Sequence, residues 1–139
     1  MNLSKQTKLL HVSPILAAGS TTNSLGTSVV DTQGYEGVRF MTTIGAVAST
    51  PTLTVQAATS TTAADFADYT TSITAASTVA SRILAVTVHR PTKRYARCTW
   101  NTTGANLVGG VIAELYGSHI VPTTNASTDV SAEGFGIST

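Results

Sequence analysis

Charged side chains are scarce in this sequence of 139 residues. They make up 11% of the chain, against about 25% in a typical globular domain, and the net charge is only +1. So small a net charge excludes a strong electrostatic field around the whole molecule. It therefore also excludes attraction of the molecule as a whole to nucleic acid or to an anionic membrane. Any electrostatic recognition must therefore be local.

Cysteine and long apolar runs are also lacking. The single cysteine, Cys98, cannot form a disulfide within the chain, so stability must come from the core or from neighbouring molecules. Its strand-like surroundings favour a small buried side chain over a reactive thiol. No stretch approaches the ~18 to 20 consecutive apolar residues of a membrane span. Pro14 and polar neighbours keep the early apolar run short of a secretory signal, so we expect an intracellular product.

The motifs of enzyme chemistry are missing as well. His11, His89 and His119 are far apart in the chain, and none lies in a metal-binding spacing. The sequence has no GxSxG elbow, phosphate-binding loop or dinucleotide motif. Its seven carboxylates are scattered, so no acid and base can be paired for hydrolysis. We predict no enzymatic activity, no metal site and no cofactor.

What the sequence does contain is threonine, alanine, serine and valine in alternating patterns. Threonine favours a pleated, half-buried environment because its branched Cβ restricts the side chain. The clearest alternation covers residues 35–44, where Val38 and Phe40 point to one face while Arg39 and Met41 point to the other. Similar patterns predict strands at residues 27–30, 52–57, 83–89, 95–102 and 107–120. The last of these is interrupted by Gly109-Gly110, which indicates a bulge or bend.

These short strands, separated by glycine and proline turns, predict an all-β, single-domain antiparallel β-sandwich or jelly roll. We expect residues 35–44 to pair antiparallel with residues 52–57. Residues 83–102 are expected to form a hairpin, because Pro91 cannot donate to a sheet ladder and makes a turn after Arg90.

The domain organisation follows from where the alternation begins and ends. We expect an N-terminal arm at residues 1–25, the sandwich at residues 26–120 and a C-terminal tail at residues 121–139. Residues 58–80 fit either a helical turn or a strand, and the sequence leaves this open.

One local charge feature stands out, a concentration of basic residues in and before the expected hairpin. Its members are Arg82, Arg90, Lys93, Arg94 and Arg97. Guanidinium groups bind carboxylate or phosphate with paired hydrogen bonds, so this basic cluster could dock an acidic protein or a nucleic-acid phosphate. It could equally be a solvated turn whose charges protect the strand ends from unwanted pairing. We favour a protein contact or a solvated surface over nucleic acid.

Several segments together resemble a known family. They are DTQGYEGVRF at residues 31–40 with Ile44-Gly45 after it, TLTVQ at residues 52–56, KRYAR at residues 93–97, and LYG at residues 115–117 with PTT at residues 122–124. In this order and spacing they resemble small proteins of tailed bacteriophages encoded beside the major capsid gene, the capsid cement or decoration proteins. The Ala-rich and Thr-rich residues 58–80 depart from the more acidic segment of similar chains.

The resemblance implies a jelly-roll-like structural protein on the capsid exterior, made in the host bacterial cytoplasm. Its implied partner is the major capsid protein, whose neighbouring subunits it would bridge, and no catalytic residue is carried over. We expect the arms to reach across to adjacent subunits or sister copies. Capsid symmetry favours self-association, with a homodimer preferred over a trimer. The alternative is a tail-associated or fibre-associated β-module that binds a host receptor or glycan.

Overall fold

The structure is a computed structural model, and it describes residues 6–14, 16–20, 24–47, 51–74, 82–101, 106–119, 125, 129 and 130. Within these residues the backbone forms eleven strands and one short 3-10 turn. In chain order they are β1 (Lys8–Ser13), β2 (Leu16–Ser20), β3 (Ser24–Gly26), β4 (Val30–Asp31), β5 (Gly37–Val47), β6 (Thr52–Ala58), η1 (Ala63–Asp65), β7 (Ala67–Thr74), β8 (Arg82–His89), β9 (Tyr95–Asn101), β10 (Asn106–Val108) and β11 (Val111–Tyr116). The prediction of an all-β chain is confirmed.

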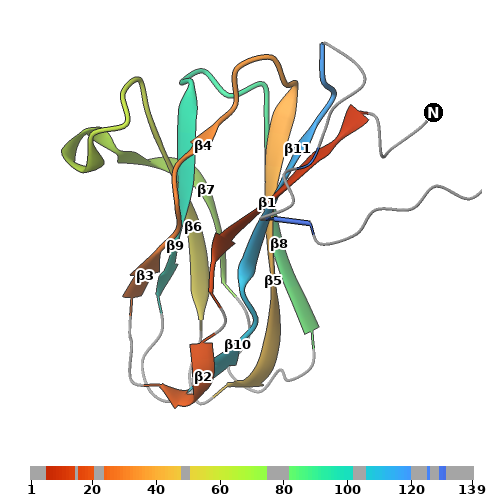
Figure 1. Cartoon of the computed structure of the whole chain (residues 1–139). Helices are drawn as coiled ribbons and strands as arrows, with labels where there is room; N and C mark the ends of the chain where they lie inside the picture. Colours follow the sequence, from red (N-terminus) through yellow and green to blue (C-terminus); the bar gives the residue numbers. More distant parts are fainter. Residues whose placement is uncertain are drawn as a thin grey trace, which may run out of the picture.

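The strands form two sheets that face each other, as Figure 1 shows. Sheet A has the order β1-β11-β5-β10-β2, with β8 also paired to β5. Sheet B has the order β3-β9-β6-β7, with β4 also paired to β9. Every pairing is antiparallel. The chain is therefore an antiparallel β-sandwich, as predicted.

Three of the strand positions are each filled by two short strands. β1 pairs with β11, and β2 pairs with β10, so each of these two neighbouring positions is filled by two short strands. β3 and β4 both pair with β9 and fill the third such position. The break between β10 and β11 falls at Gly109-Gly110, which confirms the predicted bend. The backbone passes close to β5 there, since the Gly109 N–H donates to the Thr43 carbonyl at 2.7 Å. Counting each broken strand once, the two sheets have four strands each.

Both predicted strand pairings are wrong. β5 lies in sheet A and pairs with β8 and β11, whereas β6 lies in sheet B and pairs with β9 and β7. Likewise β8 and β9 belong to different sheets, so residues 83–102 are not a hairpin. The loops after β5 and β8 cross from one sheet to the other. Alternation of side chains fixes which residues point inward, but it does not choose the neighbouring strand.

The expected N-terminal arm also differs from the structure. Residues 1–25 contain β1, β2 and the start of β3, and β1 is an edge strand of sheet A. The Ser28 N–H donates to the Val12 carbonyl at 2.8 Å, which joins the edges of the two sheets. The described part of the N-terminal segment therefore belongs to the sandwich. Of residues 121–139, only three fall within the described residues, and the remainder of this tail lies outside them. The open segment 58–80 contains both η1 and β7.

The core lies between the sheets and follows the predicted alternation. On β5, Val38 and Phe40 are fully buried while Arg39 is exposed. Trp100 and Cys98 enter the core from β9, and burial raises the pKa of the Cys98 thiol to about 12. The cysteine is thus a small buried side chain, as predicted, and its burial disfavours the thiolate.

Candidate functional site

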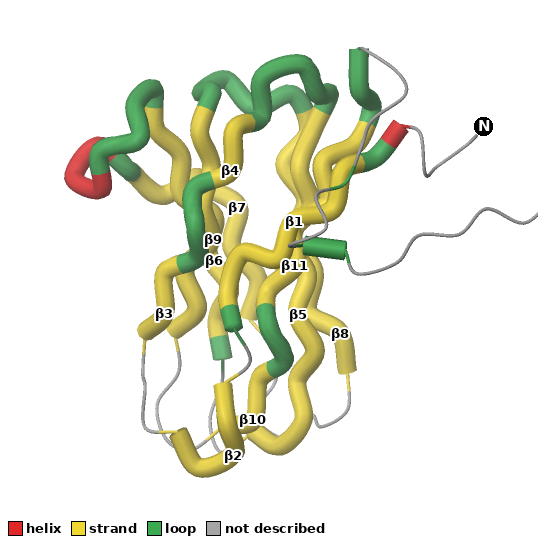
Figure 2. Tube along the Cα trace, viewed as in Figure 1, coloured by secondary structure: helices red, strands yellow, loops and turns green. Residues whose placement is uncertain are grey.

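Three loops meet at one end of the sandwich. They are residues 32–36 after β4, residues 90–94 between β8 and β9, and residues 117–119 after β11, all at the upper end in Figure 2. The Arg90 N–H donates to the Glu36 carbonyl at 2.7 Å, and the His119 N–H donates to the Gly34 carbonyl at 2.9 Å. Backbone hydrogen bonds therefore hold the three loops together.

The positions of the loops depend on residues with left-handed backbone. Gly34 has φ +86° and Gly117 has φ +65°, conformations that glycine adopts without a steric cost. Arg90 adopts φ +51° although it has a side chain, which is uncommon outside glycine. The backbone is thus fixed where the chain leaves β8.

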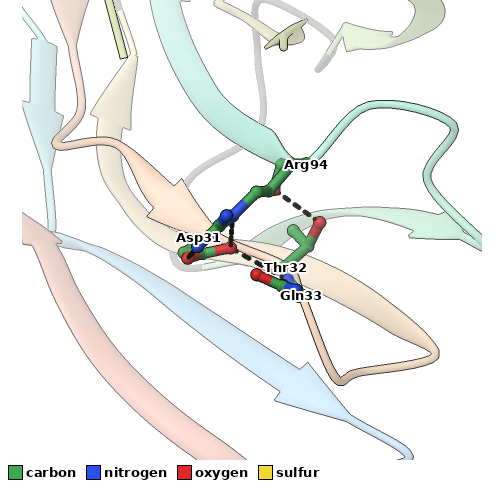
Figure 3. A network of polar contacts seen from close by, with 4 residues as sticks. All are labelled: Asp31, Thr32, Gln33 and Arg94. Carbon is green, nitrogen blue, oxygen red and sulfur yellow. Dashed lines mark hydrogen bonds and ion pairs between the residues drawn. The ribbon is translucent and has the colours of Figure 1, made fainter. Parts of the chain in front are cut away.

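A charged network stabilises the first two loops (Figure 3). Arg94 donates from Nε and a terminal nitrogen to both carboxylate oxygens of Asp31, with the shortest contact at 2.7 Å. Thr32 adds a hydrogen bond from its hydroxyl to the Arg94 carbonyl at 2.8 Å, and the Gln33 N–H donates to Asp31 at 3.0 Å. The hydrogen bond from Arg94 is the main cause that lowers the pKa of Asp31 below its ordinary value. The charge of Arg94 is therefore neutralised within the protein.

Between these loops lies a hollow of about 530 Å³, which we call the loop-end hollow. Its walls include Arg90, Lys93 and Glu36. The Arg90 side chain is 79% exposed, and its contact with the Glu36 carboxylate is long, at 4.0 Å. Among the described residues, Lys93 has no ion-pair partner. Two cations at this end are therefore available to an incoming partner.

Glu36 is also shared with the histidine that ends β8. The Nε2 atom of His89 lies 3.8 Å from a Glu36 carboxylate oxygen, and the His89 ring stacks on Tyr116 with 6.3 Å between ring centres. The nearby Glu36 carboxylate contributes to a raised pKa of the Tyr116 hydroxyl, after the larger effect of burial. Glu36 therefore links the wall of the loop-end hollow to the neighbouring His89 and Tyr116 pair, which lies outside the hollow.

The structure does not bring all of the predicted basic cluster together. Arg90, Lys93 and Arg94 line the loop-end hollow, but Arg82 begins β8 and lies at the opposite end of that strand. Arg97 points to the outer face of sheet B, where its Nε donates to Gln56 at 2.7 Å. Its guanidinium carbon also lies 4.4 Å from the centre of the Phe66 ring. Two of the five cations are thus separate from the site.

A second hollow, of about 440 Å³, lies on the outer face of sheet A. We call it the sheet A hollow, and its walls include His11, Met41, Thr43, Ile83, Gly110 and Ile112. The strand register produces it, because His11 lies opposite Ile112, and Ile112 lies opposite Met41. Sequence reasoning missed this surface. The available signal was the apolar character of Met41 and Ile112 at positions that the alternation points outward.

Two further observations concern metals and membranes. Within the described ranges, no group of three or more histidine, cysteine, aspartate or glutamate side chains could hold a metal ion. In that same part of the chain, no helix has the length and apolar character needed to cross a bilayer. The absence of enzymatic activity, cofactor and metal stays a prediction.

Comparisons with known proteins identify a fold relative but no family. No family model and no curated protein sequence matches the chain. The structure of PBSX exported protein XepA is similar, with a TM-score of 0.58 and 17% identity. The similarity covers 98% of this chain and 45% of that one, so this chain spans less than half of XepA's length. Structures of PirA and of a CBM4 align with TM-scores of 0.37 and 0.35, at 14% and 5% identity. The likeness to XepA shows that this chain shares its β-sandwich fold.

Proposed function

We propose that this protein is a capsid decoration protein of a tailed bacteriophage, which binds the outer surface of the shell and stabilises contacts between major capsid protein subunits. The observation that carries the proposal is the loop-end hollow, where the exposed Arg90 and the half-buried Lys93 line a frame of three hydrogen-bonded loops. The fold likeness to XepA, a phage protein, supports a phage structural role. The resemblance of the segments between residues 31 and 124 to decoration proteins adds the capsid as the place of action.

The strand order supports the jelly-roll part of this proposal. With broken strands counted once, sheet A contains the first, eighth, third and sixth strands in that spatial order. Sheet B contains the second, seventh, fourth and fifth. This order agrees with the winding expected for a jelly roll, an architecture that also forms viral capsid domains, and so supports that part of the proposal. A rigid sandwich of this kind presents its end loops as a fixed surface.

The chemistry of the loop-end hollow favours an acidic protein surface as the partner. Arg90 and Lys93 can pair with carboxylates of capsid subunits, while Arg94 is already occupied by Asp31 and serves to position the loop. A protein that binds only the assembled lattice stabilises it by mass action. Many copies with modest individual affinity therefore strengthen the shell together, and no catalytic step is involved.

The copy number in purified particles of the encoding phage tests the assignment to the capsid. We expect an abundance comparable to the major capsid protein, located on the head exterior and made as a homo-oligomer, with a dimer favoured. A few copies per particle, located on the tail, would instead support the receptor-binding module and contradict decoration.

A pair of charge reversals tests the docking surface. Arg90→Glu combined with Lys93→Glu should weaken binding to undecorated shells by at least about 10-fold, equivalent to about 1.4 kcal/mol. The control is Arg82→Glu, which reverses one cation at the far end of β8, is compared with each of the two single reversals, and should bind as the wild type does. Equal losses in the two variants would point to nonspecific charge attraction and overturn the role of the hollow.

A further inference from the structure

The outer face of sheet A leaves large apolar side chains uncovered. Ile83 is 70% exposed and Ile112 is 42% exposed, although both are large aliphatic residues. Met41 lies opposite Ile112 and lines the same sheet A hollow. A contiguous exposed apolar surface of this kind usually marks a place where another molecule docks.

The outward residues of this face form rows, because β5 lies between β11 and β8. In the first row, Met41 on β5 lies opposite Ile112 on β11 and opposite Ala85 on β8. This row therefore has a large side chain on its β11 side and a small one on its β8 side.

The second row lies two residues further along β5 and has the reverse order of sizes. Thr43 lies opposite Ile83 on β8, and on its other side the Thr43 carbonyl accepts a hydrogen bond from the Gly109 N–H at 2.7 Å. A Cβ at Gly109 would overlap the Thr43 Oγ1, and glycine leaves this end of the row without a side chain. The large residue of this row is therefore on the β8 side.

The two rows together make the face complementary in size to itself. A rotation of 180° about an axis that runs along β5 in the plane of contact brings the β8 side of one copy over the β11 side of the other. It places Ile112 of each copy over Ala85 of the other copy, and Ile83 over Gly109. Facing sheets pack about 10 Å apart with interdigitating side chains, so a large residue needs a small one opposite. Both rows meet this condition.

The charges beside the two rows do not oppose contact between copies. The next outward residue on β5 is Arg39, which lies opposite Glu114 on β11. A terminal nitrogen of Arg39 lies 3.8 Å from the Glu114 carboxylate, so this row carries one charge of each sign. A face with charges of one sign would repel its own copy, whereas this one has no net charge to repel a copy or to attract an acidic or basic partner. It therefore favours a second copy of the chain.

We propose that two copies of this chain pack the outer faces of sheet A together around a two-fold axis along β5, with Ile83 of each copy over Gly109 of the other. The inference names the contact surface of the homo-oligomer in the proposed function and rests on that part of it. The contact is isologous, so each apolar residue is removed from water twice. The loop-end hollow lies at the end of the sandwich, and both copies keep it open to the capsid.

Sedimentation equilibrium of the purified full-length protein tests the contact. We expect a reversible dimer at micromolar concentration. Ile83→Lys should raise its dissociation constant by at least about 100-fold, because the symmetry places the lysine in the interface twice. The matched control is Val29→Lys, which puts the same charge on another exposed large apolar residue and should leave the constant unchanged. Unfolding at nanomolar concentration, where the chain is monomeric, should be alike for the wild type and both variants.

An exchange of sizes within the first row tests the position of the axis. Ile112→Ala alone leaves a gap, and Ala85→Ile alone sets two large side chains against each other. Each should therefore weaken the dimer by at least about 10-fold. The double variant again places a large residue over a small one, so its dissociation constant should return to within about 3-fold of the wild-type value.

The alternative outcomes are distinct. A monomer at every concentration, or a dimer that Ile83→Lys does not weaken, would overturn the proposal. A double variant as weak as the weaker single variant would overturn the axis along β5, and so would a trimer. These measurements use no capsid, so their failure leaves the loop-end hollow to be judged by the charge reversals at Arg90 and Lys93. Failure of those reversals would likewise leave the dimer contact standing.

Discussion

The loop-end hollow and the sheet A hollow are similar in size, about 530 and 440 Å³, but they are built in different ways. The first is enclosed by three loops and lined by charged and polar groups such as Arg90, Lys93 and Glu36. The second lies on regular strands and is lined mainly by aliphatic groups such as Met41 and Ile112. One molecule therefore offers two surfaces of opposite chemistry.

The difference indicates that the two surfaces suit different partners. Charged groups on exposed loops contribute to orientation and association rate, and their effect weakens with salt. Apolar groups on a sheet contribute by removal from water, which is insensitive to charge. The loop-end hollow therefore suits a charged partner, and the sheet A hollow suits an apolar one.

The largest expected effect is on the free energy of unfolding, and it distinguishes a residue of the core from a residue of the sheet A hollow. Leu84 is 5% exposed and Ile83, its neighbour on β8, is 70% exposed on the opposite face. Leu84→Ala should lower the free energy of unfolding by about 2 to 5 kcal/mol, because it leaves a cavity. Ile83→Ala should lower it by no more than about 0.5 kcal/mol. Urea denaturation of the two variants measures the contrast, and equal losses would mean that Ile83 is a core residue.

A smaller effect tests whether the backbone fixes the shape of the loop-end hollow. A Cβ atom at Gly117 would lie 2.6 Å from the Glu36 Cβ, in addition to the cost of its positive φ. Gly117→Ala should therefore destabilise the fold by about 2 to 3 kcal/mol.

Gly34 provides the matched control for this substitution. It also has positive φ, but a Cβ there would meet nothing within 4 Å. Gly34→Ala should lower the free energy of unfolding by only about 1 kcal/mol, because only the positive φ disfavours alanine there. If thermal or urea unfolding ranks the two variants in the reverse order, the packing of Glu36 against Gly117 does not define the hollow.

The smallest expected effect concerns the Asp31 and Arg94 pair. The hydrogen bond from Arg94 lowers the pKa of Asp31 from its ordinary value of 3.8, so the folded protein binds this proton more weakly than the unfolded chain. The resulting stability is fully present above pH 3.8 and is lost as the pH falls through the lower folded pKa. Because both side chains are nearly half exposed, Asp31→Asn should cost under about 1 kcal/mol at pH 7.

Unfolding experiments across pH 2 to 7 measure this dependence. The difference between wild type and Asp31→Asn should shrink toward the acidic end of that range. In the Arg94→Gln background, the same aspartate substitution should have little effect at any pH. A difference that grows on acidification would contradict the role of the pair.

The sequence was informative wherever the information is local. The alternation around Val38 and Phe40, the buried state of Cys98 and the break at Gly109-Gly110 all agree with the structure. Each depends on a few adjacent residues, whose period or conformational freedom is visible in the chain itself.

The site was only partly predictable for the same reason. Arg90, Lys93 and Arg94 meet because they share one loop, whereas Arg82 is carried to the far end of β8 by the length of that strand. The partners of the loop come from distant parts of the chain. Asp31 is 63 residues from Arg94, and nothing in the local pattern indicates that they pair.

By itself, then, the sequence determined a β-sandwich with weak overall charge and fixed which side of each strand faces the core, since a period of two is set residue by residue. Only the tertiary structure decided that consecutive strands cross between sheets, that three loops enclose the loop-end hollow, and that Met41, Ile83 and Ile112 meet on one face. The physical reason is that strand pairing depends on the burial and hydrogen bonding of the whole chain at once, which no short segment encodes.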